Sequence, residues 1–292
     1  MRKILLLMIA CLSLIGCDNS QEKVDKSKLT GYDYRLFQDT PAWLLAKAVE
    51  EGNISKIKTE VLENKVNPNY QEPKYGNTLL MLAIANNEYN SAKALLSVGA
   101  DPNLPDKHRG GTAMIHAAEN DNPKYLKLLL LNKGNPDAAE TIVVENDDSP
   151  LQTATTSAIS FSRPNSLEKV KILVEAGANV NFPDSTIANN DLPLGKAFLQ
   201  DRIDIVLYLL KKGADYKRVM YKMIDGRDIY ILEALRKSII DMQSPGYQNK
   251  LEVIAFLKSK GLDYYKEPIP DYILKEIKKK YPKDWVEYAR KY

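Results

Sequence analysis

Pairs of short apolar segments, each with a polar face, follow one another along most of the chain. In residues 76–103, the apolar run 79–85 is followed by a second segment that ends in Leu95 and Leu96. A Gly-Ala-Asp or Gly-Ala-Asn triplet closes such segments at Gly99, Gly177 and Gly213. The pattern predicts amphipathic helices, and recurrence at roughly 35 residues indicates a stack of repeats.

Four units can be laid in register, at 76–103, 111–137, 149–181 and 191–215. Measured from Thr112 to Gly134, the unit at 111–137 is one residue longer than the unit at 76–103. The unit at 149–181, counted from Ser149, is seven residues longer, and we place the insertion at 160–165. In each unit a residue such as Thr78 can cap the first helix, and glycine can end the second helix in a left-handed conformation.

These features resemble the ankyrin repeat, whose pattern runs Gly-Thr-Pro-Leu-His, an Ala-Ala pair, a Leu-Leu pair and Gly-Ala-Asp. The resemblance implies an all-α ankyrin-repeat solenoid of about five to six helix-pair units over residues 41–265. Its end units should be degenerate, because a terminal repeat needs a neighbour on one face only. Residues 266–292 then form a C-terminal helical cap.

The degenerate units are recognisable at both ends. Residues 43–53 keep a first helix, and the closing turn 64–69 has asparagine in place of glycine. Near the other end, the apolar segments 231–235 and 253–257 flank an insertion around 244–246, and Gly261 closes the unit.

The N-terminus resembles a bacterial lipoprotein signal. Arg2 and Lys3 precede an apolar run that is too short to span a bilayer and reads as an export signal. The run ends in Leu-Ile-Gly-Cys, which resembles a lipobox and implies a signal peptide 1–16 and a diacylated Cys17. The alternative is an ordinary cleaved signal in which Cys17 is incidental. Residues 17–40 are polar and are expected to form a flexible tether.

Composition supplies few candidates for chemistry. Without Arg2 and Lys3, 41 basic residues become 39, against 38 acidic ones, so the charge balance predicts no nucleic-acid partner. No small-molecule substrate is predicted either, because a repeat stack rarely carries a catalytic pocket. Cys11 lies in the signal and Cys17 is the proposed lipid site, which leaves no disulfide or cysteine zinc cluster. His108 and His116 have no third histidine beside them. We therefore predict no catalytic residues, no metal and no cofactor.

Two charged segments could instead meet a protein partner. They are the basic turn of Lys107, His108 and Arg109 and the acidic link of Glu145, Asp147 and Asp148. Opposite charges on neighbouring tips would favour one docking orientation. The plain alternative is a pair of solvated turns. A lysine-rich patch at 275–283 likewise reads either as a soluble outer face or as a contact for anionic lipid.

Lipid-anchored ankyrin proteins resemble the immunity proteins paired with type VI secreted toxins, especially phospholipid-attacking lipases. The resemblance implies a tethered protein-binding module that neutralises a toxin. An aspartate after the lipidated cysteine, here Asp18, resembles an inner-membrane retention signal in enteric-type bacteria, which predicts the periplasmic face of that membrane. A periplasmic scaffold or protective partner of another enzyme is the alternative, and a hydrolase with an unrecognised site is a third.

Overall fold

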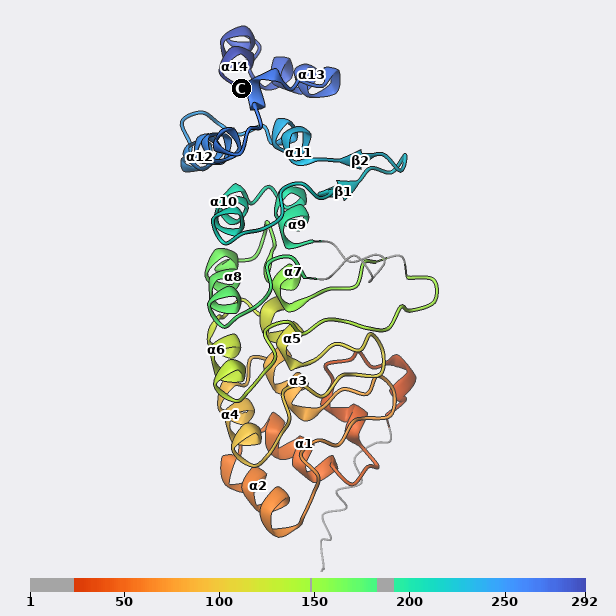
Figure 1. The fold of residues 1–292 in the computed structure, drawn as a ribbon. Helices are drawn as coiled ribbons and strands as arrows, with labels where there is room; N and C mark the ends of the chain where they lie inside the picture. The colour runs from red at the N-terminus through yellow and green to blue at the C-terminus, as the bar shows by residue number, and fades with distance from the viewer. Residues whose placement is uncertain (1–23, 148, 183–191) are drawn as a thin grey trace, which may run out of the picture.

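Six helix pairs stack side by side into one elongated solenoid (Figure 1). The computed structural model describes residues 24–147, 149–182 and 192–292. The first helices of the pairs form an inner layer, the second helices form an outer layer, and long loops, here called fingers, project from the inner side. The pairs are α1 (Trp43–Glu50) with α2 (Ile54–Lys58), α3 (Leu79–Ala85) with α4 (Tyr89–Ser97), α5 (Ala113–Glu119) with α6 (Lys124–Leu131), α7 (Ala154–Ala158) with α8 (Ser166–Glu175), α9 (Pro193–Leu199) with α10 (Ile203–Lys211), and α11 (Ile231–Lys237) with α12 (Pro245–Ser259).

Short elements complete the stack. A π-helical turn, η3 (Thr59–Glu63), extends α2, and the last finger is a small antiparallel hairpin of β1 (Tyr221–Lys222) and β2 (Asp228–Ile229) that the sequence analysis did not predict. The 3-10 turn η4 (Tyr264–Lys266) leads to the cap helices α13 (Asp271–Lys280) and α14 (Trp285–Lys291). The predicted fold class, with six pairs and a helical cap, is confirmed.

The predicted helix starts and stops follow the capping chemistry. The Thr78 and Thr153 hydroxyls accept hydrogen bonds from backbone N–H groups in the first turns of α3 and α7, at 3.3 and 3.1 Å. Gly99, Gly177 and Gly213 adopt φ angles between 91° and 101°, the left-handed region that glycine enters without steric cost.

Three details of the predicted register are wrong. Lys65, not an asparagine, takes the left-handed conformation in the first unit. Lys133 does so in the third, so Gly134 corresponds to Ala100, and the unit contains no extra residue. In the fourth unit Thr153, not Ser149, caps α7, so much of the apparent insertion belongs to the finger before it. In the first and third units the closing turn was misplaced because the left-handed residue is a lysine, a residue type that rarely adopts this conformation.

The polar tether predicted over residues 17–40 is wrong for its second half. Residues 24–38 include η1 (Lys26–Lys28) and η2 (Tyr34–Phe37) and pack against the first two units. Leu36 and Phe37 are fully buried, and Leu29 and Tyr34 are nearly so. Four large apolar side chains outweigh the polar composition of the segment, because each gains about 1.5–3 kcal/mol on burial.

The core runs continuously through all six units, and the cap adds a second small cluster around Ile273 and Ile277. Two buried tyrosines join the cap to the last unit. The Tyr288 hydroxyl donates to the Ile240 carbonyl at 2.5 Å, and the Tyr292 hydroxyl donates to the Arg236 carbonyl. In the part of the chain that the structure describes, no helix is long and apolar enough to cross a membrane.

A core substitution checks the stacking register. Leu129 on α6 is fully buried, whereas Leu131 on the same helix is 84% exposed. Leu129→Ala should lower the free energy of unfolding by about 2–5 kcal/mol, because a cavity opens in the packed core. Leu131→Ala removes the same atoms from solvent-exposed surface and should leave the denaturant midpoint close to that of the parent. Equal midpoints for Leu129→Ala and the parent would contradict this register.

Candidate functional site

Residues 24–38, here called the strap, lie against the second unit and are held by their backbone. Four strap carbonyl oxygens accept hydrogen bonds from side chains of the finger 64–78 and of the C-terminal end of α3. The donors are Lys74 Nζ to Ser27 and Leu29 (2.8 and 2.9 Å), Tyr75 Oη to Leu29 (3.1 Å), Asn77 Nδ2 to Gly31 (2.9 Å) and Asn86 Nδ2 to Tyr32 (2.9 Å). The second unit therefore binds a stretch of its own chain much as it would bind a peptide.

A hydrogen bond from Tyr34 fixes the C-terminal part of the strap. The Tyr34 hydroxyl donates to Glu88 Oε2 at 2.5 Å, at the start of α4. Burial raises the pKa of Glu88 to about 7; the Tyr34 hydrogen bond opposes the shift, and the negative charge of Glu50 adds to it. The charge state of this contact therefore changes near neutral pH.

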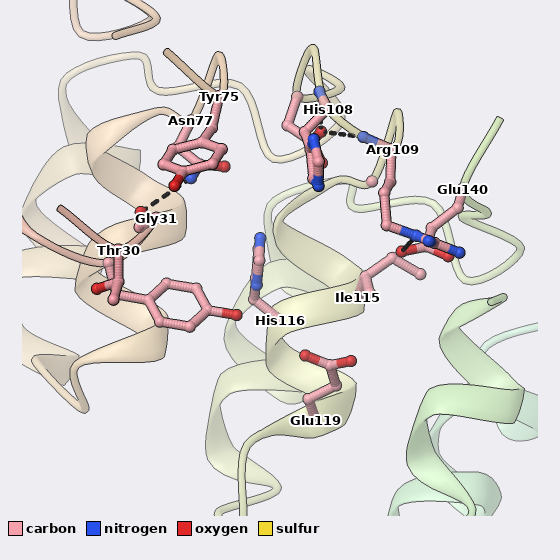
Figure 2. Close-up of a pocket in the computed structure, with 13 residues that line it drawn as sticks. Thr30, Gly31, Tyr75, Asn77, His108, Arg109, Ile115, His116, Glu119 and Glu140 are labelled. Atoms are coloured by element: carbon pink, nitrogen blue, oxygen red, sulfur yellow. Dashed lines mark hydrogen bonds and ion pairs between the residues drawn. The ribbon is translucent and has the colours of Figure 1, made fainter. Parts of the chain in front are cut away.

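Beyond the strap, the inner face is hollowed. A cavity of about 440 Å³ lies between the strap at 30–32, three successive fingers and α5 (Figure 2). Figure 2 shows His116 and Glu119 rising from the same helix toward this hollow, with His108 on the finger opposite. The hollow therefore combines three parts of the sequence that lie far apart.

Two ionisable side chains on α5, His116 and Glu119, line the hollow. His116 Nδ1 is buried without a hydrogen-bond partner, and the ring meets Tyr32 edge-on at 5.8 Å between centroids. Burial lowers the pKa of His116, so the imidazole is neutral near pH 7. Burial also raises the pKa of Glu119, with the Glu140 charge adding to the shift and Arg163 and Lys169 opposing it. Partnerless buried polar groups are costly, so a ligand that supplied hydrogen bonds here would be favoured.

The fourth unit braces the end of α5. Lys169 Nζ donates to the carbonyls of Ala118 and Asn120 at 2.6 and 3.0 Å, and Arg163 donates to the carbonyl of Glu119. These positive groups bond carbonyls that the C-terminal end of α5 leaves without helical partners, and their charge compensates the negative end of the helix dipole. Burial, assisted by the Arg163 charge, lowers the pKa of Lys169 to about 8. The loop 160–165 between α7 and α8 thus fixes the helix that carries His116 and Glu119.

Arg109 joins two fingers instead of standing free for a partner. Its Nε donates to Glu140 Oε1 at 2.9 Å, and its Nη1 pairs with Asp147. Nη2 reaches the carbonyls of Ser149 and Pro150 at 3.2 and 3.3 Å. The predicted basic turn and acidic link therefore neutralise each other in part. The premise that their charges are free is wrong for Arg109 and Asp147, because the two fingers lie side by side.

The other predicted contact residues have separate positions. Lys107, His108 and Glu145 are exposed on the fingers, and His108 also lines the hollow beside Tyr75, with ring centroids 5.7 Å apart. Cys17 and Asp148 lie outside the described residues. Partner binding by Lys107, His108 and Glu145 stays a prediction.

The strap and Glu119 were missed from the sequence. Glu119 was overlooked because nothing in its local pattern separates a groove carboxylate from a solvated one. The sequence did mark the face of α5 that lines the hollow. His116 is the fourth residue after the N-cap Thr112, and the equivalent residue of the preceding unit, four after Thr78, is Leu82. A polar residue where the preceding unit has a buried leucine could have indicated an open surface.

Substitution of Arg109 tests the contact between the fingers. Arg109→Ala leaves Glu140, whose side chain is 10% exposed, without its cation. The cost should approach the ~3 kcal/mol that follows loss of one partner from a buried ion pair. Amide hydrogen exchange should quicken at Thr141 and Ile142, whose N–H groups bond the Arg109 carbonyl. Lys107→Ala removes an exposed cation from the same turn and should change neither quantity; equal behaviour of the two variants would contradict the contact.

The strap should loosen as the pH rises through the pKa of Glu88. A carboxyl with a raised pKa binds more protons in the folded state, so its contribution to stability falls between about pH 4.5 and 7 and is constant above that range. Hydrogen exchange at the strap amides, corrected for the intrinsic pH dependence, should therefore show protection that decreases from pH 5 to 7.5. Glu88→Gln should flatten this profile, whereas Glu51→Gln, at an exposed site, should retain it. An unchanged profile in Glu88→Gln would refute the assignment.

Comparisons with known proteins agree with this architecture. A family model described as ankyrin repeats, in three copies, matches residues 7–106, 44–140 and 98–184. An ankyrin repeat protein of Acanthamoeba polyphaga mimivirus is 32% identical over 115 residues, covering 39% of this chain and 70% of the viral protein.

Other similarities are more distant. Inversin from Homo sapiens is 28% identical over 141 residues, which cover 39% of this chain but only 13% of inversin. A crystal structure of the ankyrin repeat protein EF0377 is 22% identical, with a TM-score of 0.47, covering 74% of this chain and 96% of that one. The matched repeat model spans more than half of the chain. The chain belongs to the family of ankyrin-repeat proteins, whose stacked helix pairs serve as protein-binding modules.

Proposed function

We propose that this protein is a membrane-tethered module that binds one protein partner on its concave face and neutralises it. The observation that carries the proposal is the hollow beyond the strap, which is lined by Glu119 and by His116, whose buried Nδ1 has no hydrogen-bond partner within the described residues. Protein surfaces that hold such groups gain free energy when a partner satisfies them. Ankyrin stacks are binding modules, and no catalytic role is proposed.

The sequence motif at Cys17 supports the membrane tether. Seven residue steps separate Cys17 from Val24, which packs against the core of the first units. A fully extended chain of that length spans at most about 25 Å. A lipid on Cys17 would therefore keep the first units within that distance of the bilayer surface. Asp18 favours the periplasmic face of the inner membrane.

The tether also supports a toxin as partner. An inhibitor held at a bilayer is concentrated where an enzyme that attacks phospholipid must act. The resemblance to type VI immunity lipoproteins therefore makes a secreted lipase the best candidate. This identification is by analogy of architecture and location. A scaffold that protects another periplasmic enzyme is the alternative.

Loss of the gene distinguishes the two functions. Cells that lack the protein should lose viability when grown in contact with toxin-delivering siblings, and should survive when grown apart from them. Expression of the parent chain should restore survival. The variant Cys17→Ser, which removes the lipid site, should restore survival less well, and the protein should leave the membrane fraction. A scaffold predicts loss of one periplasmic activity with no dependence on contact. Survival of the deletion strain in contact with siblings would contradict the neutralising function.

A further inference from the structure

We propose that the gap between the closing turns of the fifth and sixth units is a binding site for a small organic carboxylate with an apolar body. The gap is a cavity of about 430 Å³ that shares no residue with the hollow beside α5. Its occupancy does not depend on the proposed function, because it lies in a different part of the stack. The site forms where the hydrogen bonds that join successive turns are interrupted.

The turns that close the outer helices are joined to one another along most of the stack. In each case a side-chain oxygen of one turn accepts a hydrogen bond from a backbone N–H of the next turn. These bonds run from the N–H of Asp101 to Asn69 Oδ1 (2.7 Å), of Asn135 to Asn103 Oδ1 (2.7 Å), of Asn179 to Asp137 Oδ1 (2.8 Å) and of Asp215 to Asn181 Oδ1 (2.7 Å). Neighbouring turns from the first unit to the fifth are therefore joined in the same way.

The series stops between the fifth and sixth units. The residue in register with Asn181 is Lys217, whose ammonium group donates hydrogen bonds but cannot accept one. The N–H of Asp263, in register with the N–H of Asp215, has no acceptor within the described residues. The fifth and sixth turns therefore lack the bond that joins the others, and a backbone donor next to Leu262 is available to a ligand.

Apolar and aromatic side chains form most of the wall of the cavity. They are Tyr216 from the fifth turn, Leu262 from the sixth, and Tyr230, Ile231 and Leu232 at the start of α11. The earlier turns have proline or valine in register with Tyr216, whose ring here meets Phe256 of α12 edge-on, with centroids 6.3 Å apart. Sites for small molecules commonly have about 300–1,000 Å³ and apolar walls with a few polar groups. The cavity has this size and composition.

Cations at the rim select an anionic ligand. Lys217 and Lys260 are exposed side chains that line the cavity, and neither is paired with a carboxylate within the described residues. Two acidic side chains also line the cavity, and one of them, Glu233, is already paired with Arg227 at 2.7 Å. Glu267 is thus left against two lysines, so an anion is favoured over a cation.

A carboxylate is the anion that matches the free donors. Its oxygens accept charge-assisted hydrogen bonds from both backbone N–H and ammonium groups. The third turn gives a precedent, since the Asp137 carboxylate bonds the Asn179 N–H at this same position of the repeat. A ligand carboxylate would take that place at the Asp263 N–H and pair with Lys217, while its apolar body packs against Tyr216.

Binding of two small acids to the full chain tests the site. The probes are 2-naphthylacetate and 4-phenylbutyrate, each compared with its uncharged primary amide by isothermal titration calorimetry. At least one acid should bind about tenfold more tightly than its amide. The double variant Lys217→Ala, Lys260→Ala should weaken that acid about tenfold. Its matched control is Lys212→Ala, Lys258→Ala, which removes two exposed lysines outside the cavity and should bind within about twofold of the parent.

Repair of the missing bond is a second test. Lys217→Asn supplies the oxygen that Asn181 provides one unit earlier, so hydrogen exchange at the Asp263 amide should slow about tenfold. The acid should then lose its binding, because the new side chain occupies the same N–H. Lys217→Ala removes the same charge without supplying an acceptor, so it should weaken the acid and leave exchange at Asp263 as in the parent.

Several results would overturn the proposal. They are acids that do not bind the parent, acids that bind no better than their amides, and equal binding of an acid to the parent and to Lys217→Asn. Unchanged exchange at Asp263 in Lys217→Asn would show that the two turns are not in the assigned register, and the site would fail with it. Thermal melts establish that each variant is folded.

Discussion

Every helix pair in this protein depends on its neighbours to bury its apolar faces. The inner helices are only five to eight residues long, too short to be stable alone in water. Their stability comes from stacking, through buried residues such as Leu80 in α3 and Ala117 in α5. Because the stack supplies the stability, the side chains on its concave face are free to vary. That freedom allows polar residues to collect along one surface.

Different segments cover the apolar surface at the two ends of the stack. At the N-terminal end, the strap covers the second unit, and its own leucine and aromatic side chains complete the core. At the other end, Tyr292 packs its ring against the buried amine of Lys250, 3.6 Å from the ring centroid, so the cap covers the last unit. The strap borders the candidate hollow through residues 30–32, whereas the cap lies at the far end of the stack. The candidate site therefore lies where the strap ends.

The repeat architecture could be predicted from the sequence because stacking imposes a visible period. The Gly-Ala-Asp turns and the leucine pairs are repeated constraints, and each copy supports the others. The left-handed residues Lys65 and Lys133 could not be identified, because the surrounding structure, not the residue type, imposes their conformation. The strap was misread for a similar reason: its composition is polar, while the few apolar residues that decide its position are spread over it. The pairing of Arg109 with Asp147 depends on two fingers lying side by side, which no local pattern encodes.

Photo-crosslinking in the living cell tests the central claim that a partner occupies the middle of the concave face. His116 and Lys171 would each be replaced, in separate full-length chains, by p-benzoylphenylalanine. His116 lines the hollow beyond the strap, and Lys171 is exposed on outer helix α8. Illumination should join one protein to the chain with the probe at position 116 and none to the chain with the probe at 171. Crosslinks of equal yield at both positions, or only at 171, would place the partner elsewhere and contradict the account.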